Sequence, residues 1–237
     1  MQKVALVTGS ASGIGAATAR RLADDGMVVA VHSRSSVEAG VALATDLGGS
    51  YHQADLSSDA EAAGLVPSVL AEHRRLDVLV NNAGISWPVP HAELEGLSAA
   101  DWRRLLDVNL IAPWLLCTAA LPALRESGGC VVNVTSHAGV RPKGSSIAYA
   151  ASKAALNHVT KLLAAALGPV RVNAVAPGLV DTPLTASWTE AQELWKTSSP
   201  MRRAAQPSDV ADLISSLVHN SYITGEVVLL DGGLNLR

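Results

Sequence analysis

The stretch KVALVTGSASGIG, residues 3–15, joins an apolar run to a glycine-rich turn. The run is rich in valine and leucine, which predicts a short buried strand. Glycines 9, 13 and 15 follow at once, and the next residues have a helical pattern that ends at Gly26. A strand, a tight turn and a helix in this order predict the first unit of an α/β domain.

The same alternation continues along the chain. Apolar runs predict strands at 3–9, 27–33, 76–82, 130–136, 170–177 and 225–233. The segments between and after them predict helices at 13–25, 37–47, 58–73, 101–125, 149–167, 189–198 and 207–219. Because runs this apolar suit strands covered on both faces, we expect a doubly wound parallel sheet of about seven strands, flanked by helices on both faces.

Composition sets limits on the class of protein. The 237 residues are 49% hydrophobic and 16% charged, which predicts one folded domain over residues 1–237. The net charge of −3 offers no basic surface, so we expect no nucleic-acid partner. No run of about 18 residues lacks charged or strongly polar groups, so we expect no membrane span.

The termini and cysteines point to a cytoplasmic protein. The first predicted strand begins too close to Met1 to leave room for a signal peptide. Cys117 and Cys130 form no CxxC pair and have no nearby histidine cluster at metal-ligand spacing. We therefore expect two buried free thiols in a reducing compartment and no metal site.

The glycine-rich turn predicts a site for the pyrophosphate of a dinucleotide. Glycine lets the backbone approach the phosphates, and the helix N-terminus supplies unpaired N–H groups. An ordinary tight connection is the alternative, but the position between a strand and a helix favours the site. The candidate cofactor contacts are Gly9, Ser10, Ala11, Ser12, Gly13, Ile14 and Gly15.

The end of the second predicted strand favours NADP(H) over NAD(H). Where NAD sites carry an acidic residue, this chain has Ser33, Arg34 and Ser35. A carboxylate would repel a 2′-phosphate, whereas Arg34 can bind it through charge-assisted hydrogen bonds, with a serine adding another. A surface arginine in a turn is the alternative interpretation.

The sequence YAASK, residues 149–153, places Tyr149 and Lys153 one helical turn apart. Alone, this spacing also fits a solvated lysine beside a half-buried aromatic ring. Carbonyl reduction needs a hydride from a nicotinamide and a proton from the protein. Free tyrosine has a pKa of about 10, and a nearby ammonium group would lower it. Tyr149 is therefore the candidate general acid and base, and Lys153 the group that lowers its pKa.

Together these features give a chain that resembles the short-chain dehydrogenase/reductase family, in its compact branch with the TGxxxGxG and YxxxK motifs. The resemblance implies a Rossmann-type fold and reversible NADP(H)-dependent reduction of a ketone or aldehyde carbonyl. The matching motifs run in order along the whole chain: Thr8 to Gly15, Asp55-Leu56, Asn81-Asn82-Ala83-Gly84, Asn109, Ser136, Tyr149 with Lys153, Pro177-Gly178, and YITGEVVLLDGG at 222–233.

The resemblance also implies roles for single residues. Ser136 would orient the substrate carbonyl, Lys153 would bind the ribose hydroxyls, and Asn109 would hold a water that extends a proton relay. An asparagine disfavours a helix interior, which makes a special role for Asn109 more credible. The implied cofactor neighbours are Asp55 and Leu56 at the adenine, Asn82, Ala83 and Gly84 in the nucleotide site, and Pro177, Gly178, Val180 and Thr182 near the nicotinamide.

The substrate is the part that these residues do not specify beyond a small-molecule carbonyl or alcohol. Trp87, Trp188 and Trp195 favour an apolar or ring-bearing ketone, but core contacts would explain tryptophans equally well. His137, beside Ser136, is a possible pocket residue, although local hydrogen bonding is the commoner role. The segment 183–206 has the weakest pattern and is expected to form a mobile flap.

Two alternatives and the assembly remain open. A 3-oxoacyl-[acyl-carrier-protein] reductase needs basic residues at its entrance, which Arg141, Lys143, Arg202 and Arg203 could supply. A non-catalytic NADP-binding regulator could keep the fold, although nothing would then preserve the catalytic residues. Helices 101–125 and 149–167 are apolar beyond one face, and the resemblance implies that they pair within a homotetramer or homodimer.

Overall fold

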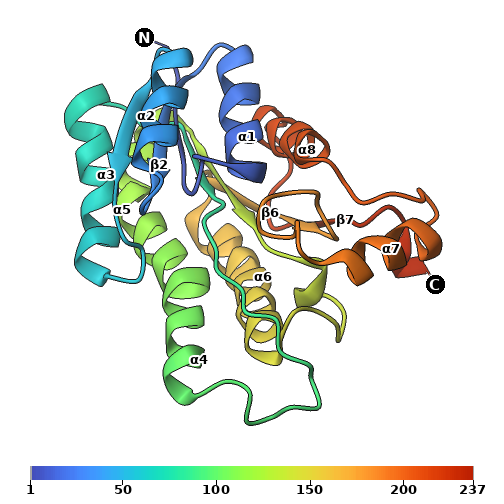
Figure 1. Cartoon of the computed structure of the whole chain (residues 1–237). Coiled ribbons are helices and arrows are strands. Elements are labelled where there is room, and N and C mark those ends of the chain that lie inside the picture. The colour runs from blue at the N-terminus through green and yellow to red at the C-terminus, as the bar shows by residue number, and fades with distance from the viewer. Residues whose placement is uncertain (1, 237) are drawn as a thin grey trace.

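The computed structural model describes residues 2–236 and contains a seven-stranded, all-parallel sheet with helices on both faces (Figure 1). The strand order is β3-β2-β1-β4-β5-β6-β7, the doubly wound arrangement predicted from the sequence. The strands are β1 Val4–Val7, β2 Val28–Ser33, β3 Ser50–Gln53, β4 Val78–Asn81, β5 Cys130–Val134, β6 Arg171–Pro177 and β7 Val227–Leu230.

The two edge strands differ most from expectation. β3 lies outside the predicted runs because its sequence, SYHQ, has no apolar run, and only alternate residues of it are buried. The predicted strand 225–233 shrinks to β7, and all four of its residues are half-buried. The expectation of strands covered on both faces is therefore wrong for β7, whose side chains stay partly exposed at the edge of the sheet.

The predicted helices are all present, with ends shifted by one or two residues. Short π and 3₁₀ turns occur at Asp107–Ile111, His137–Gly139 and Leu234–Leu236. The helices are α1 Gly13–Asp24, α2 Val37–Asp46, α3 Asp59–His73, α4 Ala99–Leu106, α5 Ala112–Ser127, α6 Ile147–Leu167, α7 Thr189–Ser198 and α8 Pro207–His219.

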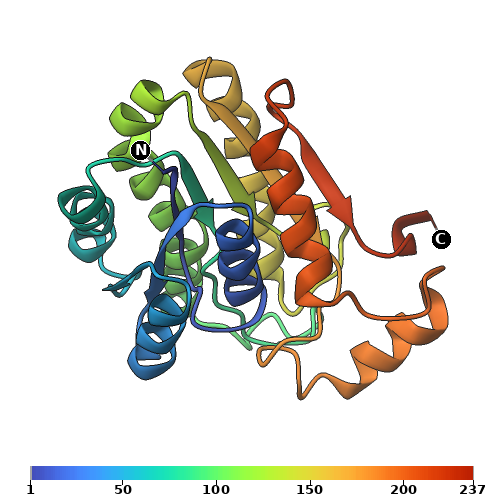
Figure 2. The ribbon, with the colours of Figure 1, turned by 90° about the horizontal axis from the view of Figure 1, so that it is seen from above.

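Two apolar layers hold the helices to the sheet (Figure 2). Alternate side chains of a strand point to opposite faces, so Leu6 of β1 joins one layer and Val7 joins the other. The first layer contains buried residues of α3, α5 and α6, and the second contains buried residues of α1, α2 and α8. Both faces of the central strands are therefore dry, as their composition predicts.

The predicted helix 101–125 corresponds to a helical stretch over Ala99–Ser127, in which the π turn at Asp107–Ile111 joins α4 to α5. By length and composition alone, it is the one helix of the described residues that could cross a membrane. Its buried residues, including Leu116, Cys117 and Leu124, pack in the first apolar layer, which explains their character without a membrane.

Both cysteines are buried free thiols, as expected. Burial raises the pKa of Cys117 to about 12, so this thiol stays protonated at neutral pH.

The strand order also positions the site. The chain moves outward from β1 through β2 to β3, and then returns to β4 on the other side of β1. Ligands of such sheets bind at the carboxyl ends of the strands, where the order reverses. The glycine-rich turn follows β1 and the Asn82 turn follows β4, so both lie at this point.

Candidate active site

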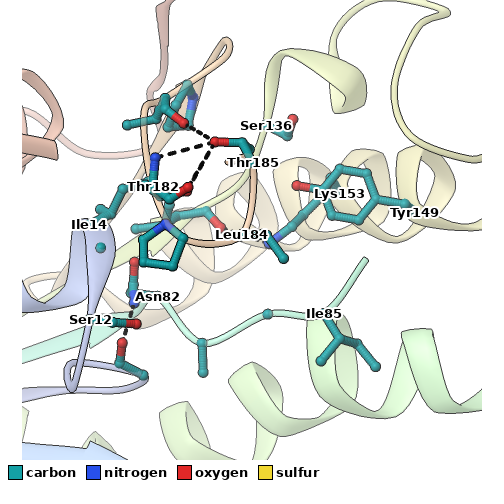
Figure 3. Close-up of a pocket in the computed structure, with 18 of the residues that line it drawn as sticks. Ser12, Ile14, Asn82, Ile85, Ser136, Tyr149, Lys153, Thr182, Leu184 and Thr185 are labelled. Atoms are coloured by element: carbon teal, nitrogen blue, oxygen red, sulfur yellow. Dashed lines mark hydrogen bonds between the residues drawn. The ribbon is translucent and has the colours of Figure 1, made fainter. Parts of the chain in front are cut away.

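A cavity of about 860 Å³ opens at the carboxyl ends of the strands. In Figure 3, Ser12, Ile14 and Asn82 lie on one side of it, and Ser136, Tyr149 and Lys153 lie on the other. All the sequence-predicted site residues line it except Ser10, Gly15 and Asn109. The lining therefore comes from the turns after β1 to β5, from α6, from Val108 of the π turn and from the segment after β6 that carries α7.

The glycine turn has the geometry that only glycine permits. Gly9 and Gly13 have positive φ angles of 65° and 55°. A Cβ added to Gly15 would lie 2.4 Å from the Gly9 carbonyl oxygen, so Gly15 allows α1 to pack closely against the turn. Gly15 itself does not line the cavity. The side-chain amide of Asn82 donates to the Thr8 carbonyl at 2.8 Å and the Gly9 carbonyl at 3.2 Å. These bonds tie the turn to the end of β4.

The N-terminus of α1 is available to an anion. Its N-cap residue, Ser12, makes no side-chain capping hydrogen bond, and the first turn carries no acidic residue. Gly13 and Ile14 of the first turn line the cavity, and the first N–H groups of a helix have no partner within the helix. This arrangement fits a pyrophosphate, together with the close approach that the glycines allow.

Ser10 and His32 form an internal brace behind the turn. The Ser10 hydroxyl donates to the Val7 carbonyl at 2.7 Å and accepts from the His32 N–H at 2.9 Å. His32 Nδ1 accepts from the Gly9 N–H at 3.0 Å, and Nε2 donates to the Ala54 carbonyl at 3.1 Å. Ser10 does not line the cavity and its hydroxyl hydrogen is engaged inside the protein, so the predicted contact of Ser10 with the cofactor stays a prediction.

His32 is a site residue that sequence reasoning missed. Burial lowers its pKa to about 4, so the ring is neutral, as its acceptor role toward Gly9 requires. A histidine within the otherwise apolar run MVVAVHS was the available signal. The ring links the glycine turn to the residues after β3, and therefore sets the shape of the cavity floor.

The end of β2 places Arg34 at the cavity edge. Arg34 is exposed, and its charge contributes to lowering the pKa of Asp55, after the larger effect of hydrogen bonds from Ser57. Ser33 is buried, and its hydroxyl is 2.9 Å from the Tyr51 hydroxyl. Arg34 and the exposed Ser35 are thus the residues here with side chains free to meet a ligand.

Tyr149, Lys153 and Ser136 meet on the other side of the cavity. The Lys153 Nζ atom lies 5.8 Å from the centroid of the Tyr149 ring and donates to the Val134 carbonyl at 3.0 Å. The Ser136 hydroxyl caps a short 3₁₀ turn by accepting from the Ala138 N–H at 3.1 Å. Ser146 caps α6 through the Tyr149 N–H, which fixes where the tyrosine emerges.

The electrostatics of this group differ from expectation. We expected Lys153 to lower the pKa of Tyr149, but burial raises that pKa, opposed by a hydrogen bond with Ser136. The physical reason is desolvation, which also lowers the pKa of Lys153 to about 8 and weakens its positive charge. In the protein alone, the expectation of a lowered tyrosine pKa is wrong.

Asn109 lies behind the cavity wall, in the π turn. Its side-chain amide donates to the Ile85 carbonyl at 3.0 Å and the Ser152 hydroxyl at 3.1 Å, and it accepts from the Ile85 N–H at 2.9 Å. Both amide N–H groups are therefore engaged by the protein and cannot donate to a water. A Cβ on Gly84 would lie 3.2 Å from Asn109 Oδ1 and 3.3 Å from Lys153 Nζ, so these two polar groups are close neighbours.

The segment after β6 covers the cavity. The Thr185 hydroxyl donates to the Val180 carbonyl and accepts from the Thr182 N–H, which closes a tight loop beside the glycine turn (Figure 3). None of the residues of α7 is buried. Trp188 and Trp195 are half-buried and line the cavity, so they are wall residues and not core contacts. A Cβ on Gly178 would lie 2.4 Å from Trp195 Cζ2, which places that ring against the turn after β6.

His137 lines the cavity beside Ser136. It is buried, its Nε2 has no hydrogen-bond partner, and that atom lies 3.6 Å from Asp231 Oδ2. Its ring meets Trp195 edge-on, with centroids 5.9 Å apart. Burial lowers the pKa of His137, and the Asp231 carboxylate opposes that shift. The cavity wall beside Ser136 therefore contains the rings of His137 and Trp195, with His137 Nε2 as a polar atom that has no hydrogen-bond partner.

The chain is similar to known proteins in sequence and in fold. A family model described as Enoyl-(Acyl carrier protein) reductase matches residues 9–235. The chain is 47% identical to ketoacyl reductase 2 of the granaticin polyketide synthase of Streptomyces violaceoruber, covering 98% of this chain and 96% of the relative. It is 37% identical to cis-4-hydroxycyclohexanecarboxylate dehydrogenase of Sinomonas cyclohexanicum, with the same coverage.

Several solved structures have the same fold as this chain. A short-chain dehydrogenase/reductase from Burkholderia xenovorans has a TM-score of 0.92 at 39% identity, covering 100% of this chain and 99% of its own. A blue fluorescent protein from a metagenomic library, in complex with NADPH, has a TM-score of 0.91 at 33% identity, covering 98% and 97%. A 3-ketoacyl-(acyl-carrier-protein) reductase from Brucella melitensis, complexed with NADH, has a TM-score of 0.91 at 32% identity, covering 98% of both chains.

Proposed function

The chain belongs to the short-chain dehydrogenase/reductase family of oxidoreductases, and on that basis we propose that it reversibly reduces a ketone or aldehyde carbonyl with NADP(H). The observation that carries this proposal is the meeting of Tyr149, Lys153 and Ser136 in the cavity that the glycine turn also lines. A side chain that can transfer a proton and a turn that can bind a pyrophosphate therefore line the same cavity.

The protein's part in the reaction is to hold the carbonyl and to move one proton. The nicotinamide cofactor supplies the hydride when it is bound. In reduction, the Ser136 hydroxyl donates to the substrate oxygen, and the Tyr149 hydroxyl gives that oxygen its proton. In oxidation, Tyr149 takes the proton back. Lys153 serves by binding the ribose hydroxyls, and its ammonium group lies beside the Tyr149 ring.

The cofactor would be held by residues of both sides of the cavity. The backbone of the glycine turn and the N-terminus of α1 suit the pyrophosphate. Arg34 with Ser35 suits a 2′-phosphate, and Asp55 and Leu56 line the adenine side. Val180 and Thr182 border the nicotinamide end. Two of the similar structures carry NADPH and NADH, so the preference for NADP(H) rests on Arg34.

The Tyr149→Phe variant tests the mechanism. Removing one hydroxyl deletes the proton donor without changing the ring, so turnover should fall by roughly 10²- to 10⁴-fold. NADPH affinity, measured by quenching of protein fluorescence, should stay within about twofold of wild type. The matched control is Tyr222→Phe, since Tyr222 is 98% exposed and lies outside the cavity. Turnover retained by Tyr149→Phe would remove Tyr149 from the proposed role.

The Arg34→Asp variant tests the cofactor preference. A carboxylate at this position repels a 2′-phosphate and can bind a ribose 2′-hydroxyl, so the ratio of kcat/KM for NADPH to that for NADH should fall at least about tenfold. Arg20→Asp, on the outer face of α1, is the control for a simple change of charge. An unchanged ratio would contradict a role for Arg34.

A second candidate function is reduction of a 3-oxoacyl group on a carrier protein. The granaticin and Brucella relatives are named as ketoacyl reductases, and Lys143 lines the cavity with its positive charge. Of the other basic candidates, Arg203 is paired with Asp209 and Arg141 with Asn235, which reduces what they can offer a partner.

A panel of ketones, aldehydes, quinones, imines and acyl thioesters separates these functions. Faster NADPH oxidation with a carrier-protein thioester than with the same acyl group on a short thiol would favour the second function. A protein that binds NADPH and turns over no member of the panel would instead support the non-catalytic regulator.

A further inference from the structure

A second cluster of ionisable side chains lies outside the cavity, between β3 and the last turn of α3. His52 comes from the middle of β3, and Glu72 and His73 come from the C-terminal end of α3. One candidate ligand atom from each lies within 4.8 Å of the other two. None of the three lines the cavity, so the proposed reaction does not use them.

The hydrogen bonds of His52 fix its tautomer. The Ser68 hydroxyl donates its single proton to the Leu65 carbonyl at 2.7 Å, so its oxygen must accept from His52 Nδ1 at 3.0 Å. Nδ1 therefore carries the ring proton, and Nε2 presents a lone pair. An imidazole held through one nitrogen, with the other left as a donor atom, is the usual state of a metal-binding histidine.

The lone pair of His52 faces a carboxylate and a second imidazole. Glu72 Oε2 lies 3.6 Å from His52 Nε2, with no proton between the two in this tautomer. In this tautomer the Ser50 hydroxyl donates to the His52 Nε2 lone pair at 2.8 Å and accepts from the His73 Nε2–H at 2.7 Å, so it links the two rings. The hydroxyl can turn away from His52 by rotation about one single bond. The three candidate ligand atoms then surround one place, to which the Glu72 carboxylate brings a negative charge.

We propose that His52, Glu72 and His73 bind a divalent transition-metal ion of the zinc class. Two imidazole nitrogens and one carboxylate are a donor set that suits Zn²⁺, and they disfavour Mg²⁺ and Ca²⁺, which prefer all-oxygen sites. A fourth position is left for water or for the Ser50 hydroxyl. On binding, His73 loses the proton from Nε2, either to its own Nδ1 or to the buffer.

The site would act as a clamp on the sheet edge. β3 has four residues and pairs with one neighbour, β2, so it is among the least secured strands. A metal ion bound by β3 and the end of α3 holds the edge strand to the helix that follows it. Asp55 and Leu56, which line the cavity, come directly after β3, so the clamp would also steady that wall.

Metal binding by the full-length protein without a histidine tag tests the proposal. Isothermal titration with Zn²⁺ should give one site per chain, and Zn²⁺ should raise the unfolding temperature. Mg²⁺ should do neither. His73→Ala and Glu72→Gln change half-buried and exposed side chains and leave the buried His52 network in place, so both variants should fold. Each should weaken Zn²⁺ binding at least about tenfold.

The control is His91→Ala, which removes an exposed histidine in a loop and should bind Zn²⁺ like wild type. Wild-type protein without a one-equivalent site would overturn the proposal. So would a site that survives in both His73→Ala and Glu72→Gln, because the ion would then lie elsewhere. The readout is binding and thermal stability, so its result does not depend on whether the protein reduces carbonyls.

Discussion

His32 shows how one buried, uncharged side chain can shape a binding site. Its ring accepts from the Gly9 N–H and donates to the Ala54 carbonyl, and the first of these bonds requires the neutral form with the proton on Nε2. The burial that lowers its pKa to about 4 therefore also preserves the glycine turn down to mildly acidic pH.

Acid should weaken the fold through this residue. The pKa falls from 6.5 in the unfolded chain to about 4, so the unfolded state takes up the proton first as pH drops. Stability attributable to His32 is complete above pH 6.5 and is lost as pH falls toward 4, by about 3 kcal/mol at most. Thermal unfolding of wild type and His32→Gln between these pH values measures it, because glutamine keeps polar atoms and does not titrate.

The expected result is a smaller acid-induced fall in unfolding temperature for His32→Gln than for wild type. His137 and His52 have lowered pKa values too and add to the fall in both proteins, so the difference between the two proteins is the informative quantity. His158→Gln, an exposed histidine on α6, should follow the wild-type curve. Identical curves for His32→Gln and wild type would contradict the assignment.

At the scale of elements, the long helix Ala99–Ser127 has an irregularity where the site needs one. Its π turn at Asp107–Ile111 contains Asn109, whose amide binds the backbone of Ile85 and the hydroxyl of Ser152. A π turn is costly in a helix and is common near functional sites. Here it lets one side chain join the turn after β4 to α6, the helix that carries Tyr149 and Lys153.

Helix α7 has the opposite character. None of its residues is buried, yet Ala191, Leu194 and Trp195 line the cavity. An element secured by few buried contacts opens at low free-energy cost. The flap expected over 183–206 is therefore a short amphipathic helix on two connecting loops, and its motion stays a prediction.

At the scale of the whole molecule, an apolar surface remains on the helices of the first layer. Trp114 of α5 is 49% exposed, Leu162 of α6 is 56% exposed, and Ile111 and Ile147 are partly exposed as well. The inner faces of these helices already pack on the sheet, so the outer apolar residues have no role in the fold of one chain. This pattern suits the twofold pairing that the family resemblance implies.

We expect the protein to be a homotetramer or homodimer at micromolar concentration, as measured by sedimentation velocity. Trp114→Glu should shift the mass toward smaller species, because it places a charge in the proposed apolar contact. Leu94→Glu is the control, since Leu94 is 77% exposed and lies in the loop before α4, outside both helices. A wild-type monomer, or a Trp114→Glu protein of unchanged mass, would count against this assembly.

The fold class and the order of nearly all the elements could be predicted from the sequence, because buried parallel strands require apolar runs and a turn with positive φ angles favours glycine. Most of the site residues named from the sequence line the cavity, since motifs such as Tyr149 with Lys153 keep a fixed spacing on one helix. Properties that depend on residues distant in the chain could be seen only in the folded structure. Burial sets the pKa of Tyr149 and Lys153, His32 braces the turn after β1, and the polar strand β3 forms because β2 lies beside it.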